Sequence, residues 1–175
     1  MPVVLTPEIK ELVNNGLASG NPLLLAAVTS DSKPLLSFRG STQVYSDGQL
    51  GLWIRKASGG TIEAIKGNPQ VAMMYRSATT PMLQFHGRGR IATGEAERER
   101  VFGNASEREQ NSDPERKGVA IVIDLDKVRR SEIRSRRSGV CEARVIAAGP
   151  GETVDTDGLR AGGQRRCGAA ASVER

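Results

Sequence analysis

The sequence contains few of the residues on which several common kinds of protein depend. Only one histidine (His86) and two cysteines (Cys141 and Cys167) occur among its 175 residues. Both cysteines lie in a C-terminal segment without apolar periodicity, so neither a structural disulfide nor a metal site is expected. The N-terminus has no basic-then-apolar leader pattern, and the longest apolar run, at residues 23–28, is too short to cross a bilayer. We therefore expect a cytoplasmic protein that does not bind membranes.

Aromatic residues are also scarce, at 3% of the chain, and none lies after residue 128. The formal net charge is +5, but ten arginines and six acidic residues after residue 128 account for most of it. This basic segment lacks the aromatic or groove-reading element that a nucleic-acid-binding protein needs, so no nucleic-acid partner is expected. We expect residues 129–175 to form a disordered tail, because they supply no apolar stripe or alternation. Residues 1–128 are expected to form one domain.

Residues 1–128 contain the patterns of short strands and short helices. Thr6, Pro7 and Glu8 predict a helix start, and Asp47-Gly48 between β-rich flanks predicts a hairpin. PLLLAAVTSDSKPLLSF predicts a strand pair, GGTIEAIKGNP a short helix, and QVAMMYR and MLQFHGRGRIATG two further strands. EAERERVF predicts a helix, NASEREQNSDPERKG a polar loop or frayed helix, and GVAIVIDL a last strand. About six strands and two to three helices with short connections predict a closed or partly closed antiparallel barrel.

From Thr6 to Val128 the sequence resembles the pyridoxamine 5′-phosphate oxidase-like flavin-binding family. The resemblance rests on RGSTQV, the hairpin, LWIRK, the helix that ends in NP, and VAMMYR followed by QFHGRGR. It implies a mainly β (α+β) fold, a split antiparallel β-barrel with short peripheral helices. It also implies an FMN cofactor and a homodimer with the flavin at the interface.

The resemblance further implies where the flavin lies. Residues 39–44 would lie along the flavin, Ile54 and Arg55 would back the ring, and Gln84 would touch its polar edge. A phosphate at the start of the GGTIEAIKG helix would meet free N–H groups and the positive end of the helix dipole. Arginine, lysine and hydroxyl side chains nearby would bind the phosphate charge. The predicted cofactor-binding residues are Arg39, Gly40, Ser41, Thr42, Ile54, Arg55, Lys56, Ser58, Gly60, Thr61 and Gln84.

Two departures from the family pattern narrow the expected function. The oxidases carry Ser-Arg-Lys where this chain has Gly59, Gly60 and Thr61, and they end in a Trp and Arg segment that is absent here. A true pyridoxamine phosphate oxidase is therefore not expected. The sequence favours an FMN-dependent oxidoreductase that transfers hydride or electrons between a reduced nicotinamide and an unidentified small substrate.

The catalytic residues cannot be assigned from the sequence. His86 is not included among them, because a lone histidine without an identified orienting partner makes a poor acid or base. The alternative is a protein of the same fold that holds flavin, deazaflavin or haem without turnover.

Overall fold

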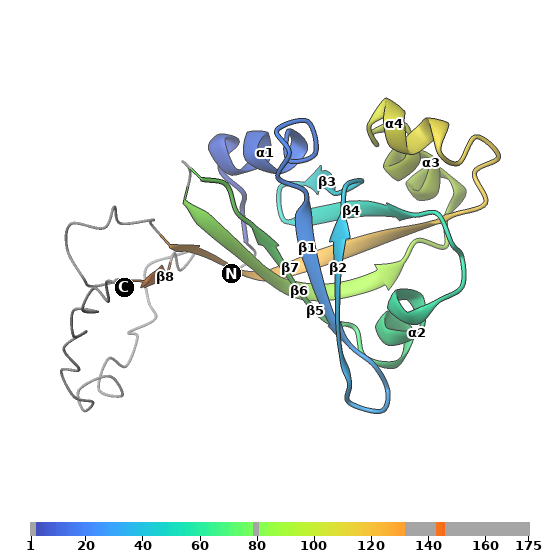
Figure 1. Ribbon diagram of the computed structural model, residues 1–175, viewed down its shortest axis with the longest axis horizontal. Coiled ribbons are helices and arrows are strands. Elements are labelled where there is room, and N and C mark those ends of the chain that lie inside the picture. The colour runs from blue at the N-terminus through green and yellow to red at the C-terminus, as the bar shows by residue number, and fades with distance from the viewer. Residues whose placement is uncertain (1–2, 79–80, 132–142, 146–175) are drawn as a thin grey trace, which may run out of the picture.

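The computed structural model describes residues 3–78 and 81–131 and the backbone of residues 143–145 (Figure 1). In chain order the elements are α1 (Pro7–Asn14), β1 (Leu23–Val28), β2 (Pro34–Arg39), β3 (Gln43–Ser46), β4 (Gln49–Ile54), α2 (Gly60–Gly67), β5 (Gln70–Tyr75), β6 (Met82–Ile91), α3 (Glu95–Gly103), α4 (Glu107–Asn111), β7 (Val119–Ser131) and β8 (Ala143–Val145). Seven strands pair in the order β2-β1-β5-β6-β7-β4-β3, and β8 pairs with β7. Every pairing is antiparallel, and the sheet does not close on itself. The predicted mainly β split barrel with short peripheral helices is confirmed.

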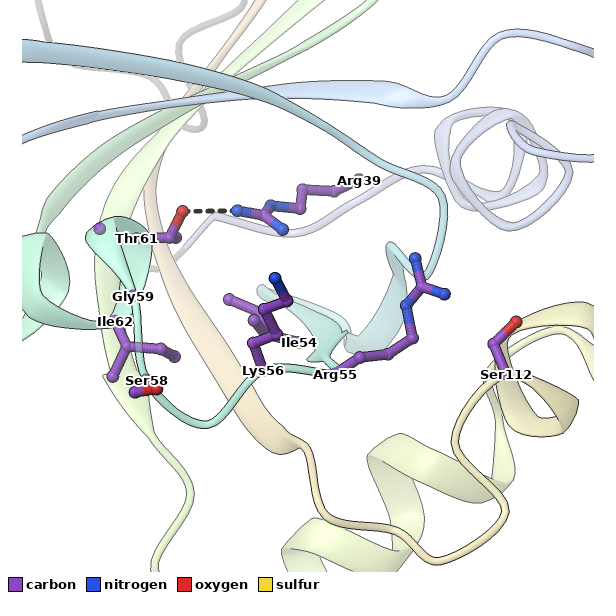
Figure 2. A pocket seen from close by; sticks show the side chains of 10 residues that line it. Arg39, Ile54, Arg55, Lys56, Ser58, Gly59, Thr61, Ile62 and Ser112 are labelled. Carbon is purple, nitrogen blue, oxygen red and sulfur yellow. Dashed lines mark hydrogen bonds between the residues drawn. The ribbon is translucent and has the colours of Figure 1, made fainter.

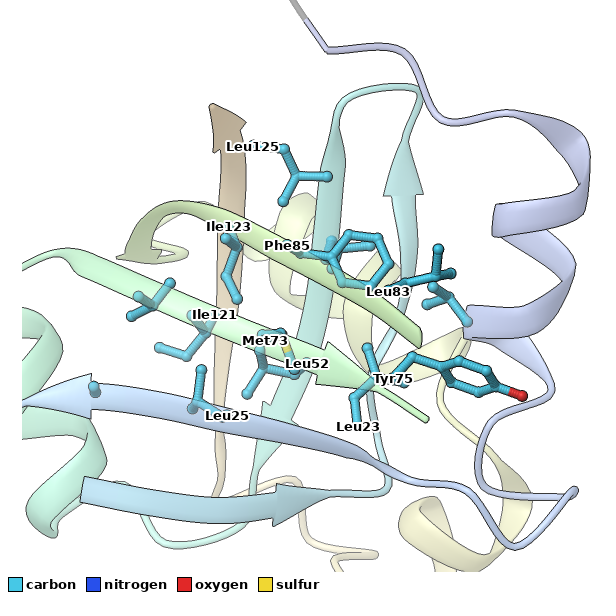
Figure 3. Close-up of a cluster of buried hydrophobic side chains, with 14 of the residues drawn as sticks. Leu23, Leu25, Leu52, Met73, Tyr75, Leu83, Phe85, Ile121, Ile123 and Leu125 are labelled. Atoms are coloured by element: carbon cyan, nitrogen blue, oxygen red, sulfur yellow. The ribbon is translucent and has the colours of Figure 1, made fainter. Parts of the chain in front are cut away.

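One face of the sheet encloses the main hydrophobic core (Figure 3). Successive residues of a strand point to opposite faces, so the apolar residues at every second position of β1, β5 and β6 gather on that face. Each large side chain that is fully buried contributes about 1.5–3 kcal/mol to stability. The side chains labelled in Figure 3 are Leu23, Leu25, Leu52, Met73, Tyr75, Leu83, Phe85, Ile121, Ile123 and Leu125.

Strand β4 and residues 120–123 of β7 are buried on both faces, because α3 packs against the face turned away from the main core. A second hydrophobic cluster lies there, with Trp53 from β4 and Phe102 from α3 at its centre. Their ring centroids are 4.9 Å apart in an edge-to-face arrangement. This packing fixes the end of β4, which leads directly into the candidate site.

The predicted helix start and hairpin are both present and lie against each other. The Thr6 hydroxyl accepts a hydrogen bond from the backbone N–H of Ile9 at 3.4 Å, as an N-cap does. The N–H of Leu5 donates to the carbonyl of Asp47 in the β3–β4 turn at 2.7 Å. A Cβ atom on Gly48 would stand 2.7 Å from the carbonyl oxygen of Val3. Glycine is therefore required at Gly48 by this close approach of the N-terminal segment.

One segment differs in extent from the sequence expectation: β7 continues to Ser131, three residues beyond the predicted domain end. The polar stretch after α3, predicted as a loop or frayed helix, contains the short helix α4. Ser131 of β7 pairs with Met82 of β6. The apolar sequence pattern of β7 ends earlier, but the main-chain pairing of the two strands does not depend on that pattern. Cys141, Cys167 and most of the predicted tail lie outside the described residues, so the boundary between domain and tail stays a prediction.

Candidate functional site

A cavity of about 530 Å³ lies where the ends of β2 and β4 meet the start of α2 (Figure 2). This volume falls within the range of about 300–1,000 Å³ that is usual for small-molecule sites. Seven of the eleven predicted cofactor-binding residues line it. The lining residues are Arg39, Ile54, Arg55, Lys56, Ser58, Gly59, Gly60, Thr61, Ile62 and Ser112.

Arg39, the last residue of β2, is half-buried and reaches across the cavity to α2. One of its terminal nitrogens donates to the hydroxyl of Thr61 at 2.5 Å, as Figure 2 shows. Its Nε is buried and has no hydrogen-bond partner among the described residues. Burial lowers the pKa of the Arg39 guanidinium, and the negative charge of Glu109 opposes this shift. Arg39 therefore presents a partly desolvated cation with an unused donor.

The start of α2 presents backbone donors to the same cavity. The first hydrogen bond within the helix runs from the N–H of Glu63 to the carbonyl of Gly59 at 3.1 Å, and no side chain caps the helix. The N–H groups of the first three helical residues therefore have no helical acceptor. Gly59 adopts φ 137° and ψ 173°, a conformation that is essentially restricted to glycine. This geometry turns the chain from Ser58 into the helix and leaves its N-terminus open.

The charges around the cavity are unevenly paired. Arg55 is exposed, and its Nε lies 3.9 Å from the carboxylate of Glu109, whose side chain is only 18% exposed. Lys56 is also exposed, and no ion pair of its side chain occurs in the described part of the chain. Three cations and one nearby carboxylate leave a net positive charge at the cavity.

Behind the cavity, β4 is tied to the loop that follows α4. The buried carboxylate of Asp113 accepts hydrogen bonds from Trp53 Nε1 at 3.0 Å, from the N–H of Gly118 at 2.8 Å and from the N–H of Lys117 at 3.0 Å. Burial raises the pKa of Asp113, but these hydrogen bonds outweigh it, so the pKa is lowered overall. The anchor holds Ser112 at the cavity wall.

Three predicted residues line a second cavity, of about 440 Å³, between α1 and the loop that joins α3 to α4. These are Gly40, Ser41 and Thr42, and Gln43 lines the same cavity. The hydroxyl of Ser41 donates to the carbonyl of Trp53 and accepts from its N–H, and the hydroxyl of Thr42 donates to the carbonyl of Arg39. Of the stretch predicted to lie along the flavin, Arg39 lines the first cavity and residues 40–44 line the second, where the hydroxyls of Ser41 and Thr42 are bonded within the chain.

The eleventh predicted residue, Gln84, lines neither of these cavities. It lies half-buried on β6, where it pairs with Met74 of β5 and Arg129 of β7. His86 follows on the same face, and its Nε2 is buried without a hydrogen-bond partner among the described residues. Neither Gln84 nor His86 therefore lines the first or the second cavity.

Glu109 and Asp113 were not predicted from the sequence, because both lie in a stretch whose only recognisable feature is that it is polar. No short-range pattern identifies either residue, because Trp53, a partner of Asp113, and Arg55, the partner of Glu109, are far away in the sequence. In the described part of the chain no group of three or more histidine, cysteine, aspartate or glutamate side chains could hold a metal ion. No helix there is both long enough and apolar enough to span a membrane.

Neither a protein-family model nor a curated protein sequence matches the chain. Solved structures do match. HupZ of Group A Streptococcus has a TM-score of 0.57 at 20% identity, covering 72% of this chain and 93% of that one. An FMN-binding protein from Syntrophomonas wolfei has a TM-score of 0.57 at 9% identity, covering 73% and 89%.

A third match belongs by description to the pyridoxinephosphate oxidase family. It is a Clostridium acetobutylicum protein related to general stress protein 26 of B. subtilis, with a TM-score of 0.54 at 12% identity and coverage of 78% and 96%. At these identities the likeness concerns the fold. The resemblance predicted from the sequence is confirmed at that level.

Proposed function

We propose that the protein is an FMN-binding oxidoreductase that transfers hydride or electrons between a reduced nicotinamide and a small substrate. The observation that carries the proposal is the first cavity, where the uncapped N-terminus of α2 and the side chains of Arg39, Arg55 and Lys56 converge. A helix N-terminus flanked by cations is a favourable environment for a phosphate group. The resemblance of the neighbouring sequence to flavin-binding split barrels, together with the likeness in fold, favours FMN as the phosphate ligand.

The residues of the first cavity fit the phosphate of FMN. Arg39 offers its unpartnered Nε, and the backbone of Gly60 approaches the cavity without a side chain. A Cβ atom on Gly60 would lie 3.0 Å from Leu35, so a larger residue would crowd this wall. Three cations against the single charge of Glu109 leave about two positive charges, which balance the charge of about −1.5 to −2 of a phosphate monoester.

Bound FMN would supply the redox chemistry, so the chain needs to hold and orient it. Ile54 gives an apolar wall beside the phosphate site. Ser41 and Thr42 would support the ring through shape and backbone, because their hydroxyls are already bonded within the chain.

A homodimer with the flavin at its interface would explain the position of Gln84. Direct cross-strand partners form a row from Phe38 through Leu24 and Met74 to Gln84, so these side chains share one face of the sheet. Phe38 is 71% exposed on this face, and its neighbour Leu36 is 66% exposed. A second copy covering this apolar surface would bring Gln84 of one protomer toward the partner's flavin.

A second candidate function is flavin or deazaflavin binding without turnover. Among the described residues that line the first cavity there is no histidine, cysteine, aspartate or glutamate to serve as acid or base. They include no ordinary ligand for haem iron either, so haem binding, the other form of this alternative, would need a ligand from outside the first cavity.

Equilibrium titration of the purified protein with FMN and riboflavin tests the proposal. FMN should bind more tightly, because riboflavin lacks the charge-assisted hydrogen bonds of the phosphate. Equal affinities would refute the phosphate assignment, and absence of binding to both would refute the flavin function. Stopped-flow mixing of the FMN complex with NADH and NADPH then separates the candidates: bleaching of the flavin supports the oxidoreductase, and an unchanged spectrum supports the binding protein.

A further inference from the structure

Glu109 lies beside the positive charges of the first cavity. Its carboxylate is largely buried, and one oxygen lies 3.9 Å from Nε of Arg55. Its negative charge also acts on Arg39. The other oxygen would lie 3.2 Å from a Cβ atom on Gly40, which lines the second cavity. Glu109 lines neither cavity itself, but it lies next to Arg55 of the first cavity and Gly40 of the second, and its charge acts on both arginines that are proposed to bind phosphate.

The position of this carboxylate is set by the fold. Helix α4 has five residues, which is too short to be stable by itself in water. It is held by the loop that follows, where Asp113 accepts the hydrogen bond of Trp53 in β4. Arg55 directly follows the last residue of β4, so the hydrogen bond from Trp53 to Asp113 ties the segment that carries Glu109 to the segment that carries Arg55.

We propose that Glu109 is an internal counter-ion of Arg39 and Arg55 that weakens and tunes the binding of phosphate monoesters in the first cavity. In the free protein it partly neutralises two cations, one of them half-buried. A bound phosphate would compete with the carboxylate of Glu109 for the same two guanidinium groups. The two anions would also repel each other, because they carry charges of the same sign. The inference deepens the proposed FMN site and rests on that function for the identity of its ligand.

The test replaces Glu109 by Gln, which keeps the size and polarity of the side chain and removes its charge. The affinities of wild type and variant for FMN, riboflavin and inorganic phosphate are measured by isothermal titration calorimetry. E109Q should bind FMN about five- to tenfold more tightly, from the removal of one mostly buried like charge, and riboflavin equally well. Glu107→Gln is the matched control, since Glu107 is an exposed residue of the same helix that does not line either cavity. It should leave all three affinities unchanged.

Each outcome bears on a different claim. If FMN binds wild type and E109Q equally, the counter-ion role is refuted and the proposed function stands. If inorganic phosphate binds and E109Q strengthens it while no flavin binds, the counter-ion role stands and the FMN function fails. If nothing binds to any variant, both are refuted. If E109Q does not fold, Glu109→Asp is used instead, because its side chain is one methylene shorter and its carboxylate lies farther from the arginines. An FMN affinity no tighter than that of wild type would then overturn the inference.

Discussion

Replacement of Asp113 by Ala should strongly destabilise the protein, because this carboxylate joins the loop after α4 to β4. It accepts hydrogen bonds from the indole of Trp53 and from the backbone N–H groups of Gly118 and Lys117. Trp53 and Gly118 are buried, so water cannot easily replace the lost acceptor, whereas Lys117 is exposed. The substitution therefore leaves two buried donors unsatisfied.

The expected size follows from these contacts. An unsatisfied buried donor costs about 1–3 kcal/mol, and hydrogen bonds to a charged group lie at the upper end. Two such donors and the partly rehydrated third give a loss of about 3–5 kcal/mol in the free energy of unfolding. A loss of this size is a large part of the roughly 5–15 kcal/mol by which a domain is usually stable.

Urea unfolding measured by far-ultraviolet circular dichroism and by fluorescence gives the assay, since Trp53 is the only tryptophan in the sequence. Asp126→Ala is the control: Asp126 is exposed and lies 3.6 Å from Nε of Arg88, a surface pair expected to contribute less than about 1 kcal/mol. If Asp113→Ala loses no more stability than Asp126→Ala, the loop is not held by this carboxylate. The reasoning about α4 and the cavity wall would then be wrong.

Further predictions concern Asp113, the residues of the first cavity and the C-terminal residues. The pKa of Asp113 is lowered in the folded protein, so its ionised carboxylate stabilises the fold fully above the unfolded pKa of about 3.9. This stabilisation should be lost as the pH falls through the lower pKa of the folded state, and acid unfolding of Asp113→Asn should lack this pH-dependent loss. In fluorescence titrations Arg39→Ala should weaken FMN binding about ten- to hundredfold, from a charged hydrogen bond of about 1.5–3 kcal/mol, and leave riboflavin binding unchanged. Lys56→Ala, at an exposed position, should cost less than about fivefold. Gly59→Ala should cost about 1–3 kcal/mol in thermal unfolding, because φ is 137°. A chain ended after Ser131 should fold and should have the same oligomeric state as the full chain in analytical ultracentrifugation; a different state would show that later residues contribute to assembly.

The features predicted correctly from the sequence are those determined by short-range chemistry. The cap at Thr6, the hairpin at Asp47-Gly48 and the short helix before Pro69 each depend on residues a few positions apart. The alternation of buried and more exposed residues along β6 likewise follows from the alternation of apolar and polar residues in its sequence. Such patterns need no knowledge of the partner element, so one sequence is enough to recognise them.

The features that were missed depend on contacts between distant segments. Trp53 and Asp113 are 60 residues apart, and the charge of Glu109 matters only because α4 is brought against Arg55. The alternation within β4 is hidden because α3 buries its second face as well. A polar stretch such as residues 104–118 gives no sign of which buried donor it will satisfy.

The charges that are absent from the start of α2 can be supplied by other parts of the chain. The family pattern places positive residues where this chain has Gly60 and Thr61, and the sequence predicts that nearby arginine and lysine side chains take their role. In the structure the guanidinium of Arg39 reaches from β2 to the hydroxyl of Thr61 and stands at the same helix start. A cation held by a neighbouring strand is already ordered by that hydrogen bond, so less conformational entropy is lost when a phosphate binds. If FMN binds as proposed, the charge at the helix start is supplied by a different element of the fold, and its position there is fixed before the ligand arrives.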